Sequence, residues 1–196
     1  MNHNTTKPMK TMMKNMIIEL QCVYTEGEND VWKKDYLLNG KKLHPAFSLQ
    51  VYNHSPDGFN HGYGGSGPTQ LALAICLEVF GPAGECFYKE FKSKHVAGFG
   101  HDEENSPHSD AQHRTWTVLV DMSPWAEKVK NKSKVIEFPA DMSYKYRVAL
   151  IEQHEMQPGR FASRIWLHLP GNKLWEWNHQ NRRKLAIAEK VTFVFW

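Results

Sequence analysis

Apolar and polar residues alternate over short stretches in both halves of the chain, and such alternation predicts β-strands. In the first half the stretches are residues 16–24, 34–38 and 47–52. The dipeptide Asn39-Gly40 follows the second stretch and favours a two-residue hairpin turn into Lys41–Leu43. In the second half the pattern predicts strands at residues 113–120, 144–152, 160–169 and 191–196.

One segment is apolar almost without interruption. Residues 71–77 follow a glycine-rich stretch and predict a helix over residues 68–79 that is buried on most sides. Pro68 suits the first helical position, with Gly67 as the N-cap and Gln70 reaching back to the cap. Further helices are predicted at residues 83–96, 123–130 and 175–188.

The order of these elements indicates the fold class. Strands precede and follow the helices without regular βαβ alternation, which predicts an α+β fold. We expect a mixed or antiparallel sheet packed on a buried helix that a glycine-rich loop precedes. We expect residues 1–15 to be a disordered basic terminus and residues 16–135 to form the glycine-loop domain. Residues 136–196 are expected to be a β-rich extension packed on the same sheet as one domain, with residues 191–196 at an exposed edge that can pair with a second copy.

Composition narrows the class of protein. A net charge of +3 over 196 residues is too small to favour nucleic acid as a partner. No apolar run has the length of a membrane span, so we expect no membrane association. Cys22, Cys76 and Cys86 include no C-x-x-C pair, which predicts reduced thiols in a cytoplasmic protein.

The glycine-rich stretch is the clearest candidate site. Residues 62–67 read Gly-Tyr-Gly-Gly-Ser-Gly and fit G-x-G-x-x-G, but no βαβ unit surrounds them. Pro68 stands where a phosphate loop needs lysine, which argues against nucleotide hydrolysis by that mechanism. Main-chain N–H groups at such a loop can still form an anion nest at a helix start. The alternative is that the glycines only allow the helix to pack closely. The predicted ligand-binding residues are His61, Tyr63, Gly64, Gly65, Ser66, Gly67, Thr69 and Gln70.

Two polar segments offer other chemistry. His54, Asp57 and His61 can bind a metal or act as general acid and base, although their spacing matches no known ligand signature. Residues 101–113 contain three histidines and four carboxylates. This composition can chelate a divalent metal ion, but it is also typical of a solvated surface loop. We therefore predict no metal site and no cofactor.

Residues 54–74 resemble the hallmark HSPDGF-x-x-GYGGSGP-x-QLALA of a family of uncharacterised proteins found in prokaryotes, plasmids and phages. The resemblance extends over roughly the first half of the chain, to Val96. It departs at His61, where the family usually has tryptophan. The family has no established activity, so the resemblance implies only a mobile-element origin.

These observations predict a non-enzymatic binding module that holds a phosphate-bearing small molecule or an acidic partner at residues 62–70. One alternative is a protein-interaction factor that contacts a host protein through Trp166, Trp175 or Trp177. Another is a hydrolase that depends on His54, Asp57 and His61, with or without a metal. A homo-oligomer is compatible with each of them.

Overall fold

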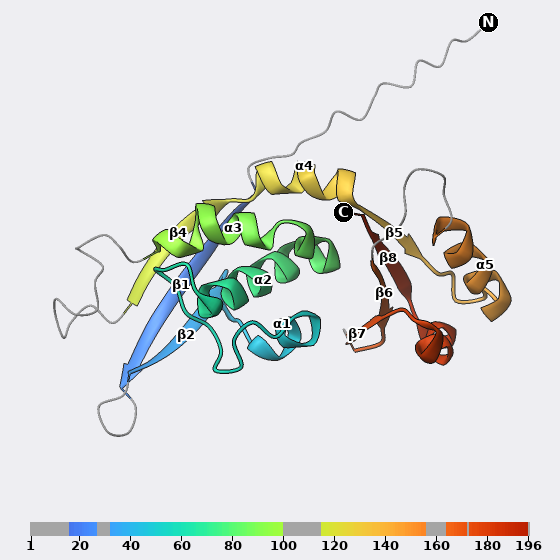
Figure 1. Ribbon diagram of the computed structural model, residues 1–196, viewed down its shortest axis with the longest axis horizontal. Helices are drawn as coiled ribbons and strands as arrows, with labels where there is room; N and C mark the ends of the chain where they lie inside the picture. Colours follow the sequence, from blue (N-terminus) through green and yellow to red (C-terminus); the bar gives the residue numbers. More distant parts are fainter. Residues whose placement is uncertain (1–15, 27–31, 100–114, 156–163, 172, 196) are drawn as a thin grey trace, which may run out of the picture.

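The computed structural model of the protein describes residues 16–26, 32–99, 115–155, 164–171 and 173–195. Residues 1–15 and the polar loop 101–113, for which the sequence made predictions, lie outside these ranges. The described residues form helices and two four-stranded antiparallel sheets, which confirms the α+β fold class (Figure 1). Within these residues, no single helix combines the length and the apolar character needed to cross a membrane.

The first sheet comes from the N-terminal half and β4. The Asn39-Gly40 turn joins two of its strands, and both residues have positive φ (51° and 75°), as a type I′ hairpin turn requires. The hairpin prediction is therefore confirmed. The strand order is β3 (Lys41–Lys42), β2 (Trp32–Leu38), β1 (Ile17–Glu26) and β4 (Thr115–Asp121).

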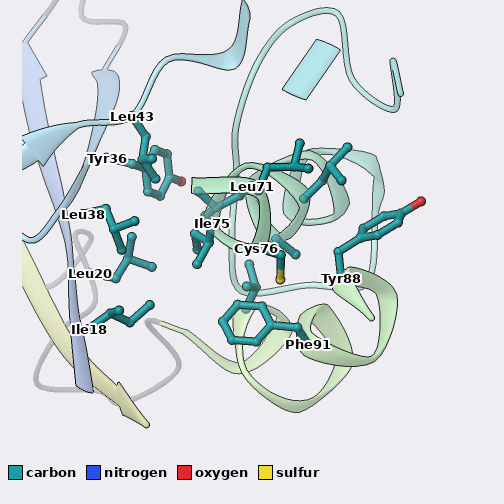
Figure 2. Packing of buried hydrophobic residues seen from close by; sticks show 14 of the residues in the cluster. Ile18, Leu20, Tyr36, Leu38, Leu43, Leu71, Ile75, Cys76, Tyr88 and Phe91 are labelled. Atoms are coloured by element: carbon teal, nitrogen blue, oxygen red, sulfur yellow. The ribbon is translucent and has the colours of Figure 1, made fainter. Parts of the chain in front are cut away.

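Helix α2 (Ser66–Phe80) lies across one face of this sheet, with α3 (Tyr88–Lys94) beside it (Figure 1). Every residue of α2 from Leu71 to Leu77 is buried, as the unbroken apolar run predicted. Figure 2 shows Leu20 and Leu38 projecting from the sheet toward Ile75 of this helix. Burial of large apolar side chains on both surfaces is the main stabilising contribution to this half of the molecule.

The second sheet belongs to the C-terminal part of the chain. Helix α4 (Ser123–Lys132), close to its predicted range, leads from the first sheet to the second (Figure 1). Helix α5 (Tyr144–Glu155) and the 3-10 segment η5 (His179–Ile187) pack on the second sheet through Ile151 and Leu185. The strand order is β5 (Ser133–Glu137), β8 (Lys190–Val194), β6 (Arg164–Leu169) and β7 (Lys173–Glu176).

Two predicted strands are helices. Residues 47–52 lie mostly in α1 (Pro45–Val51), where Pro45 begins the helix and Ser48 and Val51 point into the core. Residues 144–152 lie in α5, where Arg147 and Ile151 are buried one turn apart. In residues 47–52 the apolar positions fit the helical period as well as the strand period, whereas in residues 144–152 they follow no clear helical period and only the packing of the helix determines its form.

Four further predictions need correction. Strand β8 is central, between β5 and β6, so residues 191–194 do not form the expected sheet edge. The helix predicted over residues 83–96 is divided into η2 (Gly81–Cys86), α3 and η3 (Val96–Gly98). The C-terminal strands make a sheet of their own instead of joining the first one, and the helix predicted at 175–188 is the end of β7 followed by η5.

A buried ion pair connects segment η2, which follows α2, to strand β6 of the second sheet. The Glu85 carboxylate in η2, which has no exposed side-chain surface, lies 2.7 Å from Nη1 of Arg164 on β6. It also accepts a hydrogen bond from Trp166 Nε1 at 3.0 Å. Burial raises the pKa of the Glu85 carboxyl, and the contacts with Trp166 and Arg164 oppose that rise. The N-terminal and C-terminal halves of the chain are thus joined by a buried polar contact.

Candidate functional site

The glycine-rich loop runs directly into α2. The helix begins at Ser66, with Gly65 at the N-cap in an extended conformation (φ −82°, ψ −165°) and no side-chain cap. The predicted cap at Gly67 with a returning Gln70 is therefore wrong. The first turn of a long, buried helix is left without the side-chain acceptor that Ser, Thr, Asp or Asn would supply.

Gln70 supports the fold beneath the loop. Its side chain is fully buried, and its Oε1 accepts from the backbone N–H of His54 at 2.8 Å and of Ser55 at 3.3 Å. Its Nε2 donates to Ser48 Oγ at 2.8 Å. The amide group of Gln70 thus ties α1 and the segment before the loop to α2.

The loop presents main-chain donors at the protein surface. Gly62 N–H donates to Val96 O at 3.0 Å. Among the described residues, no protein acceptor lies on the amides of residues 64–67. Gly64 and Ser66 are exposed. Lys92 Nζ, from α3, donates to Gly64 O at 3.2 Å and brings a positive charge to the loop. Donors and charge together can hold an anion.

Most of the loop glycines also have a packing reason. Gly62 has φ +80°, and a Cβ there would lie 3.0 Å from Phe99 O. A Cβ on Gly65 would lie 2.2 Å from Tyr63 Cε2, and one on Gly67 2.6 Å from Asn60 Cβ. Only Gly64 among these has open space around it. The alternative reading, glycines for close packing, therefore explains three positions and gives no packing reason for Gly64.

Two other predicted ligand residues flank the loop. Tyr63 is 47% exposed, and its ring lies against Gly65, where it can stack on or cap a bound group. Thr69 is half-buried, and its Oγ1 donates to Gly65 O at 2.7 Å. Thr69 therefore stabilises the loop through this hydrogen bond from the first turn of α2.

His61 is held by side chains of three strands. Nδ1 lies 2.7 Å from the Tyr36 hydroxyl, and Nε2 lies 3.1 Å from Trp116 Nε1 and 3.3 Å from the Tyr24 hydroxyl. Figure 2 shows Tyr36 projecting from the sheet into the core. The His61 ring thus joins the first sheet to the start of the loop, and its predicted contact with an anion stays a prediction.

The groups behind His61 are neutral at ordinary pH. Burial raises the pKa of the Cys22 thiol to about 12 and that of the Tyr24 hydroxyl to about 12. A thiol must ionise to be a good nucleophile, so Cys22 has no thiolate to offer here. This cluster is a buried hydrogen-bonding network, and no reactive group in it is exposed.

The three residues of the hydrolase hypothesis do not meet. His54 Nε2 lies 2.9 Å from the Tyr88 hydroxyl, and burial, reinforced by Lys89 and Lys92, lowers the pKa of its imidazole. Asp57 lies in a separate hollow described below. Within the part of the chain that the structure describes, no group of three His, Cys, Asp or Glu side chains is placed to hold a metal ion.

The three tryptophans of the interaction hypothesis differ in exposure. Trp166 is 2% exposed and donates a hydrogen bond to Glu85. Trp177 is half-buried against the apolar cluster of the second sheet. Trp175 is 40% exposed, with Lys184 Nζ 4.2 Å from its ring centroid. They do not form one exposed patch of the kind that marks an interface.

Sequence reasoning missed a hollow at the edge of the first sheet. It has a volume of about 590 Å³ and lies between β2, the segment after β3, and residues 57–60. Lys33, Lys34 and Lys42 line it, together with His44, Asp57 and Asn60. The signals in the sequence were the Lys33-Lys34 pair and the short stretch after the Asn39-Gly40 turn.

The chain matches a protein-family model over part of its length. Residues 26–118 match the model of DUF6166, a family of unknown function. The matched range includes the glycine-rich loop, His61 and its partner Trp116. No curated protein and no solved structure matches the chain. Over these residues the chain is therefore similar to a family whose function is not known.

Proposed function

We propose that the protein is a non-catalytic binding module that holds the phosphate group of a small molecule, or of an acidic partner, at the loop of residues 62–70. The main-chain N–H groups of residues 64–67 would donate to the phosphate oxygens, with the Ser66 hydroxyl beside them. Tyr63 would cover the rest of the ligand. The mobile-element origin implied by the family resemblance stays a prediction.

One observation carries this proposal. The first turn of α2 has no side-chain cap, and Lys92 stands next to it with its ammonium 3.2 Å from Gly64 O. Helix N-termini favour negative charge, because their amides and the helix dipole both point at a bound anion. His61, Thr69 and Gln70 support the loop from the protein side in this proposal.

The test is a titration of the full chain with inorganic pyrophosphate, followed by amide chemical shifts in ¹H–¹⁵N correlation spectra. We expect the largest shifts at Gly64, Gly65, Ser66 and Gly67. Gly64→Glu places a carboxylate at the loop, and we expect it to weaken binding about tenfold or more through repulsion. Gly64→Ala is the matched variant and should bind normally, because the added methyl meets no atom within 4 Å.

The lysines of α3 provide a second matched pair. Lys92→Ala should weaken pyrophosphate binding several-fold, and Lys89→Ala on the same helix should not. The proposal fails if the shifts occur away from the loop, or if Gly64→Glu binds pyrophosphate as the unaltered protein does.

A further inference from the structure

We infer that the hollow beside β2 binds an acidic peptide segment in extended conformation, paired as an added strand with the open edge of β2. This site is distinct from the glycine-rich loop and does not depend on the function proposed for it. Asn60 lies between the two, because it lines the hollow and also contacts Gly67.

Among the described residues, β2 has no pairing strand on its outer side before Tyr36, because β3 is short. Strand β3 has two residues and pairs Lys42 with Leu37 and Lys41 with Leu38, whereas β2 has seven residues. The last rung is Leu43 N–H to Tyr36 O at 2.8 Å, after which the chain turns into α1. Pairing groups alternate between the two sides of a strand, so Lys34, two residues before Tyr36, directs its N–H and C=O to the same open side.

The charge around this edge is positive. Lys33, Lys34 and Lys42 line the hollow against the carboxylates of Asp35 and Asp57. Lys42 Nζ already pairs with Asp35 at 2.7 Å, which leaves two ammonium groups for Asp57. Among the described residues no acceptor is paired with Lys33. The surplus of positive charge in the hollow favours an acidic occupant.

The Lys34 ammonium is also fixed in place. Nζ donates to Asn60 Oδ1 at 2.8 Å and lies 5.7 Å from the centroid of the Tyr24 ring. A cation held in this way loses less conformational entropy when it binds a carboxylate than a freely moving one does.

A peptide suits this hollow better than a small anion does. The exposed edge offers a C=O acceptor as well as an N–H donor, and a fully ionised phosphate has no donor for that C=O. An extended peptide supplies both partners, as in other cases of strand addition, while its acidic side chains reach the lysines. The size of the hollow, about 590 Å³, is enough for a few residues of such a strand.

The experiment measures fluorescence anisotropy of a labelled Glu-Val-Glu-Val-Glu peptide with the full-length protein. A second peptide carries N-methyl groups on alternate backbone nitrogens and keeps every charge. We expect the unmodified peptide to bind and the N-methylated one to bind about tenfold more weakly, since it cannot pair with β2.

Three variants locate the site. Lys33→Glu should weaken binding about tenfold, and Lys145→Glu on α5, which makes the same change of charge on an exposed lysine, should leave it unchanged. Asp57→Asn should strengthen binding, because it removes a carboxylate that competes with the peptide for the lysines. Circular dichroism checks that each variant is folded.

Several results would overturn the inference. Equal binding of the N-methylated peptide would mean that charge alone attracts the peptide. Binding of inorganic pyrophosphate that Lys33→Glu abolishes would make the hollow a small-anion site. Loss of peptide binding in Gly64→Glu but not in Lys33→Glu would place the peptide at the glycine-rich loop, and concentration-dependent dimerisation that Lys33→Glu abolishes would make a second copy the occupant.

Discussion

The Tyr36 hydroxyl lies 2.7 Å from Nδ1 of His61, and the other ring nitrogen determines which of the two groups donates. Trp116 Nε1–H can only donate, and it lies 3.1 Å from His61 Nε2. Nε2 must therefore be unprotonated, so the neutral ring carries its proton on Nδ1 and donates it to the Tyr36 oxygen. Tyr36 and Trp116 are 1% and 4% exposed, so water cannot replace His61 as their partner.

Replacing His61 by phenylalanine should destabilise the protein by about 1–3 kcal/mol, the usual cost of leaving a buried donor without its acceptor. The ring of phenylalanine fills similar space, so the loss reports on hydrogen bonding. Urea unfolding monitored by circular dichroism measures this free energy.

Trp116→Phe provides the control for that measurement. In the double variant the two losses should be less than additive, because each single change breaks the same hydrogen bond. Full additivity, or a His61→Phe variant as stable as the unaltered protein, would contradict the network described above.

The ion pair between η2 and β6 should be a second sensitive point. Arg164→Met removes the guanidinium and leaves the buried Glu85 carboxylate without its cation, for which a loss of about 3–5 kcal/mol is expected. The loss should be much smaller when Glu85→Gln is combined with Arg164→Met, because no buried charge is then left over. Equal unfolding free energies for the single and the double variant would show that the Glu85 carboxyl left by Arg164→Met does not carry a costly buried charge.

The parts of the fold that the sequence predicted correctly depend on local geometry. Asn39 and Gly40 tolerate positive φ, and residues 71–77 are apolar on every side, so no distant contact is needed to interpret them. Residues 47–52 fit both periods, and the deciding contact, from Gln70 to Ser48, comes from 22 residues away. In α5, Arg147 Nη1 donates to Ala188 O at 2.7 Å, which no local pattern indicates.

The candidate sites also differ in how far local sequence predicts them. The glycine-rich loop was visible because its chemistry lies in consecutive residues. The partners of His61 come from β1, β2 and β4, and their convergence needs the strand order of the sheet. The hollow depends on where β3 stops, which is set by the departure of the chain into α1 after Leu43.

Stability should decrease as the pH falls from about 6.5 toward 4, in part because of His168. Burial, reinforced by Lys190, lowers the pKa of this imidazole from 6.5 to about 4, and Nε2 lies 2.7 Å from Thr192 Oγ1. Between these values the unfolded chain binds a proton that the folded chain does not, so acid favours unfolding. His168→Gln should reduce the slope of unfolding free energy against pH in that window. His54, His95 and His154, whose pKa values are also lowered, remain in the variant and account for the slope that is left. An unchanged slope would show that His168 does not contribute to it.

Two glycines, neither of which has a positive φ, should differ in their response to alanine. A Cβ on Gly84 in η2 would lie 2.2 Å from Cys76 O, a backbone atom of α2 that cannot move without the helix. We expect Gly84→Ala to cost about 2 kcal/mol or more, which exceeds the gain of up to about 1 kcal/mol from a less flexible unfolded chain. At Gly64 the same change meets no atom within 4 Å and should alter stability by less than about 0.5 kcal/mol. Thermal unfolding of the two variants side by side measures the difference. A Gly84→Ala variant as stable as Gly64→Ala would mean that η2 does not pack against α2 as closely as described, and the position of Glu85 opposite Arg164 would then need another support.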